Sequence, residues 1–186
     1  MPRWADFAEA APEIATPAQA LLERFRFVFT GTIRRDGTPR ISPVEAHLVG
    51  GALVLVMIRG TLKARDVLRD PRVVLNTPVV DPANPEAEVK LRGRVVEVED
   101  EDLREATAAT LEAASGWRPD PSWHVFSLDL DDAAHIAWKD GVMTMTRWTA
   151  EGGVERVERA VAVLDARRER RRVEDARSEP GTRARV

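Results

Sequence analysis

The chain has 186 residues, of which 44% are hydrophobic and 32% charged, and its formal net charge is −3. This composition excludes a globally disordered chain and is typical of one globular domain with a buried core. Because the sequence contains no cysteine, disulfides, thiolate nucleophiles and cysteine-ligated metal centres are also excluded.

The charges are unevenly distributed along the chain. From Asp165 onward there are eight arginines and five acidic residues, which leaves 20 basic and 26 acidic residues in the rest. Nucleic-acid binding requires a concentrated basic face, so this acidic body predicts no nucleic-acid partner. The longest uncharged stretch, residues 47–58, is shorter than the roughly 20 residues that cross a bilayer, and the N-terminus lacks an apolar signal-peptide core. We therefore expect a cytoplasmic protein without membrane contact.

Residues 1–24 predict an N-terminal helical segment. Two short helices are expected, divided at Pro12 and Pro17. Thr16 is suited to be the N-cap of the second helix, with Pro17 at its first position. Leu21 and Leu22 would then face inward.

Three strands are predicted next, because aromatic and β-branched residues dominate three successive runs. These runs are residues 25–33, 40–49 and 52–58. The turn pairs Asp36-Gly37 and Gly50-Gly51 connect them into a meander. A meander of this kind is typical of a β-barrel or sandwich rather than of a βαβ unit.

The rest of the chain alternates helices and strands. One helix is predicted from Thr61 to Pro71, and a second from residues 99–102 to Gly116. The further strands are residues 72–80, 89–98, 123–130, 134–138 and 142–148. Gly93 interrupts an alternating pattern and predicts a bulge.

These elements predict three parts of the chain. Residues 25–150 form an α+β domain, an antiparallel barrel of six or seven strands with inserted helices, which follows the N-terminal helical segment 1–24. Residues 151–186 are expected to be an arginine-rich C-terminal extension that is partly disordered.

Recognised catalytic motifs are nearly absent from the sequence. It has no metal-ligand spacing and no glycine-rich nucleotide motif, so no metal site is predicted. The histidines, His47, His124 and His135, fall on separate predicted strands, and we interpret them as structural. Two further groups have a structural interpretation as well: a solvated rim (Asp129, Asp131 and Asp132) and aromatic packing residues (Trp138 and Trp148).

One segment is chemically unusual. In residues 59–65, Gly60 precedes Thr61 and Lys63 at a predicted helix start. The helix macrodipole favours acidic residues at this end, so a lysine there increases the local positive potential. Free backbone N–H groups, a hydroxyl and a cation converge, and this arrangement suits a phosphate. The alternative interpretation is an ordinary helix start with a solvated Lys63.

Two longer motifs surround this segment. The first is Gly37-Thr38-Pro39-Arg40-Ile41-Ser42-Pro43-Val44, and the second is Gly60-Thr61-Leu62-Lys63-Ala64-Arg65 with Asp70-Pro71-Arg72-Val73. Together with the later segment that contains Val89, Leu91 and Gly93, they resemble the pyridoxamine 5′-phosphate oxidase-like family of flavin-binding split barrels. The resemblance covers about residues 17–148. It implies a homodimer of six-stranded antiparallel split barrels with two flavin sites at the subunit interface.

The resemblance also implies which residues contact the cofactor, which is FMN or alternatively a deazaflavin coenzyme. The second strand follows the isoalloxazine, here with Arg40, Ile41, Ser42, Pro43 and Val44. The end of the third strand lines the ring and the ribityl chain, here with Val56, Met57 and Ile58. The helix start takes the 5′-phosphate through Thr61 and Lys63, and Glu88 on the fifth strand approaches the flavin.

Three positions depart from the family pattern. Leu62 stands where many members have a basic residue, and Glu88 stands where many have a neutral amide. Residues 142–148 contain no histidine where true pyridoxine phosphate oxidases have an Arg-x-His pair, so we do not expect vitamin B6 oxidation.

The implied function is a flavin-dependent oxidoreductase that acts on a small organic substrate. Such an enzyme needs few catalytic side chains, because the cofactor carries the redox chemistry. Two alternatives stay open: a non-catalytic flavin or tetrapyrrole binding, storage or stress-response protein on the same fold, and an interaction protein whose arginine-rich tail binds an acidic partner.

Overall fold

The computed structural model describes residues 3–79 and 87–160, which form four helices and eight strands. The helices are α1 (Trp4–Ala10), α2 (Pro12–Phe25), α3 (Leu62–Arg69) and α4 (Glu101–Ser115), and the strands are β1 (Phe27–Ile33), β2 (Pro39–Val49), β3 (Ala52–Met57), β4 (Arg72–Asn76), β5 (Ala87–Glu97), β6 (His124–Lys139), β7 (Val142–Thr149) and β8 (Gly153–Ala160). No helix in these two ranges is long and apolar enough to cross a membrane.

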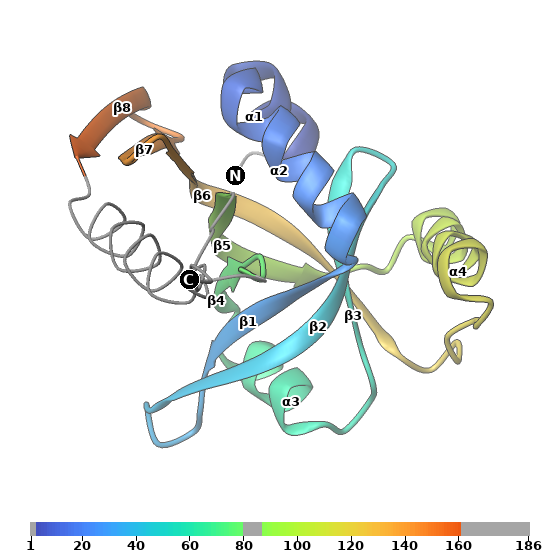
Figure 1. Cartoon of the computed structure of the whole chain (residues 1–186). Coiled ribbons are helices and arrows are strands. Elements are labelled where there is room, and N and C mark those ends of the chain that lie inside the picture. The colour runs from blue at the N-terminus through green and yellow to red at the C-terminus, as the bar shows by residue number, and fades with distance from the viewer. Residues whose placement is uncertain (1–2, 80–86, 161–186) are drawn as a thin grey trace, which may run out of the picture.

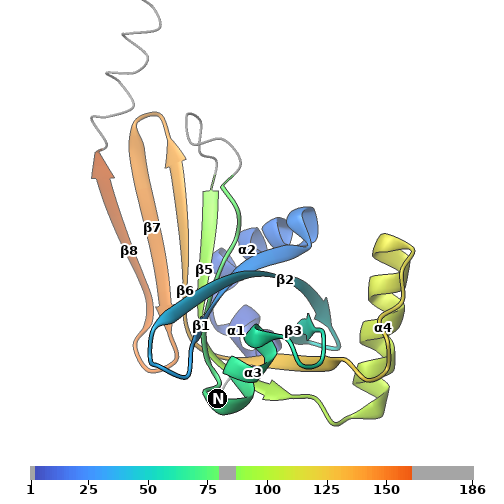
Figure 2. The same cartoon turned by 90° about the horizontal axis from the view of Figure 1, so that it is seen from below.

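All eight strands belong to one antiparallel sheet in the order β3-β2-β1-β4-β5-β6-β7-β8 (Figure 1). An additional pairing of β3 with β6 closes the first six of these strands into a barrel. The predicted α+β fold, a six-stranded antiparallel split barrel with inserted helices, is therefore confirmed. Seen from below, β7 and β8 continue the sheet on one side of the barrel, and α4 stands on the other side (Figure 2).

The core fills the barrel and one outer face of it. Inside the barrel, Leu55, Leu75 and Leu128 are fully buried together with residues of α1 and α2. Outside, a second cluster packs α4 against β3 and β6, with Leu111 and Val125 among its members. As a result, every residue of β3 is buried, as its continuous apolar run predicts.

The N-terminal helices differ from the prediction at Pro17. The second helix starts at Pro12, which occupies its first turn, and runs through Pro17 without a break. A proline inside a helix costs one backbone hydrogen bond. Burial of the α2 face that contains Ile14 and Leu22 against the barrel offsets this cost.

Two strands differ from the prediction as well. The sequence predicts separate strands at residues 123–130 and 134–138, but β6 is continuous over both. A bulge at Arg92 and Gly93 shifts the register between β5 and β6, and this shift lets the pairing continue along β6. The bulge predicted at Gly93 is confirmed, and a Cβ at this position would lie only 1.9 Å from the carbonyl oxygen of Asp129. The predicted strand at residues 72–80 ends at Asn76.

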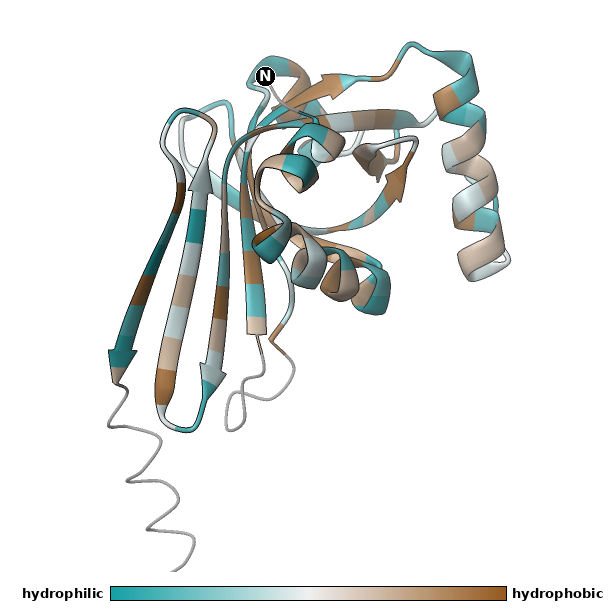
Figure 3. Cartoon of the chain, turned by 90° about the horizontal axis from the view of Figure 1, so that it is seen from above, coloured by the Kyte–Doolittle hydropathy of each residue, from teal (hydrophilic) through white to brown (hydrophobic). Residues whose placement is uncertain are grey.

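The strand β8 has no counterpart in the prediction. It lies at the edge of the sheet within residues that the sequence assigns to the C-terminal extension, and it pairs only with β7. Its two valines, Val154 and Val157, are each followed by two charged residues, so the sequence lacks the apolar alternation that predicts a strand (Figure 3). The rest of the extension, from residue 161 onward, and the segment of residues 80–86 lie outside the described residues.

Candidate functional site

The start of α3 has the open geometry that an anion requires. Thr61 is the N-cap with extended backbone angles, but its side chain does not cap the helix. Instead, its hydroxyl donates a hydrogen bond of 2.9 Å to the carbonyl oxygen of Ile58. The first turn of α3 also has no acidic residue. The N–H groups of this turn therefore have no side-chain acceptor in the described part of the chain, and they add to the positive end of the helix dipole.

Lys63 projects from this turn toward β2. Its Nζ donates a hydrogen bond of 2.9 Å to the carbonyl oxygen of Pro43. No carboxylate in the described part of the chain forms an ion pair with it. Burial lowers the pKa of Lys63 below its ordinary value, and the charge of Glu45 opposes this effect. A half-buried cation that forms no ion pair with the described residues, beside an uncapped helix start, fits a phosphate group.

The middle of α3 is held to the barrel by a buried carboxylate. Asp66 accepts hydrogen bonds from Arg40 Nε at 2.6 Å and from the hydroxyl of Thr32 at 3.1 Å. Arg69, one turn later, is 3.4 Å from the same carboxylate and also donates to the carbonyl oxygen of Ile33. This network joins α3 to the adjoining ends of β1 and β2, and it thereby positions the helix start near Pro43. The local sequence does not single out Asp66, because its partners lie far away along the chain.

The other predicted cofactor residues fall into two groups. Val44, Val56 and Met57 are buried in the core clusters, so their side chains are directed away from solvent. Along the same segments, Ile41 and Ile58 are exposed by 74% and 47%, and they bring apolar surface to the neighbourhood of Pro43 and Ser42.

Glu88 lies on β5, away from α3. Its carboxylate is 3.0 Å from Lys90 Nζ, and the side-chain amide of Asn76 is 3.4 Å from it. The structure thus brings together the predicted residues of β2, the end of β3 and α3, whereas it gives Glu88 partners of its own on β4 and β5.

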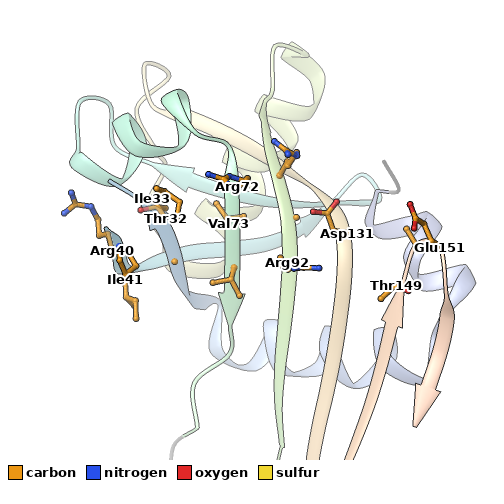
Figure 4. A pocket seen from close by; sticks show the side chains of 16 residues that line it. Thr32, Ile33, Arg40, Ile41, Arg72, Val73, Arg92, Asp131, Thr149 and Glu151 are labelled. Carbon is orange, nitrogen blue, oxygen red and sulfur yellow. The ribbon is translucent and has the colours of Figure 1, made fainter. Parts of the chain in front are cut away.

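A cleft of about 780 Å³ lies on the outer face of the sheet, next to the first residues of β2 (Figure 4). Four arginines line it: Arg40, Arg72, Arg92 and Arg94. The first three form ion pairs with Asp66, Asp70 and Asp132, respectively. Since most of its positive charge is already neutralised, this cleft is a weaker candidate for the phosphate than the start of α3. Of the predicted cofactor residues, it contains only Arg40 and Ile41.

The three histidines lie in different parts of the barrel. Burial lowers the pKa of His47 and of His135, which favours their neutral forms. Among the described residues, the Nε2 of His47 is buried without a hydrogen-bond partner, and a cavity of about 280 Å³ lies beside it. His124 pairs with Glu97.

Comparison with known proteins identifies the fold. No curated protein matches the sequence significantly. Among solved structures, a pyridoxamine 5′-phosphate oxidase-related FMN-binding protein from Nostoc punctiforme superposes with a TM-score of 0.55 at 13% identity, covering 83% of this chain and 97% of that one. PhzG from Burkholderia lata, in complex with tetrahydrophenazine-1-carboxylic acid, gives 0.56 at 11% identity, with 86% and 94% covered. A haem-binding protein from Mycobacterium smegmatis gives 0.51 at 17% identity, with 91% and 94% covered.

At these identities the solved structures establish a shared fold only, and their ligands are of three different kinds. The sequence itself is more specific. The family model described as pyridoxamine 5′-phosphate oxidase matches residues 15–137, which include the whole barrel meander, α3 and most of β6. Because this match covers well over half of its length, the chain belongs to the pyridoxamine 5′-phosphate oxidase family.

Proposed function

We propose that the protein binds FMN, or alternatively a deazaflavin coenzyme, and uses it as an oxidoreductase on a small organic substrate. The observation that carries this proposal is Lys63: it is a half-buried cation without a carboxylate partner in the described ranges, next to the uncapped start of α3. The FMN-binding relative from Nostoc punctiforme supports a flavin in particular.

Different residues of this site would contact different parts of the cofactor. Lys63 and the N–H groups of the first turn of α3 would hold the 5′-phosphate, because both are donors without a competing side-chain acceptor. Ile41 and Ile58 would supply apolar contacts to the ring system. The Asp66 network keeps α3 in place, so the phosphate donors do not have to be ordered when the ligand binds. When bound, a flavin supplies the hydride chemistry for which this chain lacks side chains.

We also propose that the protein is a homodimer. Ile41 and Val74 flank Gly31 on the outer face of the sheet, and Phe29 follows two residues away on the same face. These three side chains are 74%, 46% and 41% exposed, respectively, which is unusual for large apolar residues that lie together. A second copy of the chain that packs on this face would bury them, in agreement with the interface implied by the family resemblance.

The cofactor proposal is tested by titrating the purified protein with FMN and, separately, with riboflavin, using calorimetry or flavin fluorescence. We expect FMN to bind at least about tenfold more tightly, since riboflavin lacks the phosphate group that Lys63 contacts. Equal affinities would contradict the phosphate site. No binding of either compound, together with a Soret band in the purified protein, would instead support the tetrapyrrole-binding alternative.

A further inference from the structure

A histidine and a glutamate form a close pair at the junction of β5 and β6. His124 Nδ1 lies 2.5 Å from Oε1 of Glu97, and the two side chains are 11% and 41% exposed, respectively. A carboxylate at this distance accepts the Nδ1 proton, so it fixes the tautomer in which Nε2 has the free lone pair. Nε2 has no hydrogen-bond partner among the described residues, and it is not fully buried. It is therefore accessible to solvent.

The pair faces a cleft of about 680 Å³ between α3, α4 and the segment of residues 116–123. The cleft has a rigid wall, because Arg104 donates hydrogen bonds to the carbonyl oxygens of Val98, Pro121 and Trp123. Its lining includes the half-exposed Leu68 and, at its base, Val56 and Val125, which are each 6% exposed. This volume and this mixture of surfaces are typical of a site for a small organic molecule.

Acidic groups outnumber basic groups around His124. Five carboxylates line the cleft: Glu97, Glu99, Glu101, Glu105 and Asp120. Three cations line it, of which Arg118 is paired with Glu105, Arg104 is held by backbone carbonyl oxygens, and Arg59 has no ion-pair partner among the described residues. The net negative charge disfavours an anionic ligand and favours a neutral or cationic one.

The cleft also adjoins the proposed cofactor site. His124 lies opposite Met57 in the register of β3 and β6, at the end of β3. The chain continues from Met57 through Ile58 and Arg59 to Thr61, the N-cap of α3. The end of β3 therefore contributes both to the cleft, through Val56 and Arg59, and to the connection that leads into the phosphate site.

We propose that this cleft binds the substrate and that His124 exchanges a proton with it through Nε2, with Glu97 as the positioning residue; this inference rests on the proposed flavin function. For a neutral ketone or quinone, His124 would give a proton through Nε2 to a carbonyl oxygen and would regain a proton from water. A bound flavin would supply the hydride and would be oxidised. One hydride and one proton together balance the reduction of a ketone to an alcohol or of a quinone to a hydroquinone.

The first test uses the FMN-loaded protein, reduced anaerobically, and follows the reduction of menadione by stopped flow. We expect His124→Gln to slow the step at least about a hundredfold. Glu97→Gln should have a smaller effect of about tenfold. The control, His135→Gln, changes another histidine of β6 and should retain the wild-type rate. An unchanged rate in His124→Gln, with normal FMN affinity, would overturn this inference alone, whereas failure of wild type to bind FMN would overturn the proposed function.

A second test does not depend on the cofactor. Diethyl pyrocarbonate acylates accessible neutral imidazoles, and mass spectrometry locates the modified residue. His124 should react at least about tenfold faster than His47, whose Nε2 is buried, and Glu97→Gln should slow the modification. A His124 that is no more reactive than His47 would show that Nε2 does not face the cleft and would overturn the proposal.

Discussion

Arg40 and Asp66 form a buried ion pair, with 2.6 Å between Nε of the first and Oδ2 of the second. The side chains are 19% and 6% exposed, respectively. Family resemblance assigns Arg40 to the cofactor, but in this structure its guanidinium is directed to α3. The pair joins the first residues of β2 to the helix whose start carries Lys63, so Arg40 contributes to the phosphate site by positioning it.

Removal of the carboxylate from this pair should destabilise the fold. Asp66→Asn leaves Arg40 partly buried without a counter-charge, and breaking such a pair costs about 3 kcal/mol. We expect a correspondingly lower free energy of unfolding in urea. As a control, Asp70→Asn removes the partner of Arg72, whose side chain is 63% exposed, and should change the same quantity by less than about 1 kcal/mol. Equal effects of the two substitutions would refute the structural role of Asp66.

The same carboxylate predicts how stability depends on pH. Burial by itself would raise the pKa of Asp66, but the hydrogen bonds from Arg40 and Thr32 outweigh it, so the pKa lies below its ordinary value of 3.8. A carboxyl group with a lower pKa in the folded state stabilises the protein above its unfolded-state pKa, and this contribution is lost as pH falls through the folded-state value. The urea midpoint of wild type should therefore decrease below about pH 4, and the decrease should be smaller in Asp66→Asn. Identical acid limbs in both proteins would contradict this assignment.

Substitution of Gly93 tests the bulge that allows β6 to be continuous. In Gly93→Ala the new Cβ would collide with the backbone at Asp129, which cannot rotate away, so we expect a loss of about 3 kcal/mol or more in the free energy of unfolding. Gly31→Ala is the matched variant, because the one atom that its Cβ would approach closely is in the side chain of Val74, at 2.7 Å, and the nearest backbone atom is 3.5 Å away. That side chain can move, and the loss should be nearer about 1 kcal/mol. A smaller effect at Gly93 than at Gly31 would be inconsistent with the bulge geometry.

The proposed homodimer depends on the apolar outer face. Ile41→Lys places a charge at its most exposed member and should shift the protein toward monomer, with at least about a tenfold weaker dimer affinity. Light scattering coupled to gel filtration measures this shift across a concentration series. Val154→Lys, on β8, introduces the same charge at a valine that is 39% exposed and should leave the dimer intact. A monomeric wild-type protein would rule out the interface directly.

Local patterns in the sequence predict most of the barrel, because strand alternation and tight turns are short-range signals. Gly50 and Gly51 both have positive φ angles, as the predicted turn requires, and Gly93 produces the predicted bulge. Where the predicted strands are wrong, the structure depends on interactions between residues that are far apart in the sequence and lie on neighbouring strands. The aspartates near residue 131 suggest a break, but Asp132 pairs with Arg92 on β5 and the strand continues. The strand β8 lies at the edge of the sheet and needs no apolar face. Its charged sequence therefore does not predict a strand.

The candidate site also combines features that the local sequence predicts with features that depend on long-range contacts. The helix start with Thr61 and Lys63 is readable from five consecutive residues, whereas Asp66 gains its role from Thr32 and Arg40, which are 34 and 26 positions away. Similarly, His124 is unremarkable in the sequence and becomes a candidate only when the sheet brings Glu97, 27 positions earlier, within 2.5 Å.

The affinity of the Lys63→Ala variant for FMN shows whether the start of α3 holds the phosphate. Lys139→Ala, a change at the exposed end of β6, is the charge-matched control. Loss of one charge-assisted contact to a phosphate costs about 1.5–3 kcal/mol, so Lys63→Ala should weaken binding at least about tenfold while Lys139→Ala binds as wild type does. If both variants bind FMN with wild-type affinity, the phosphate is not held at the start of α3.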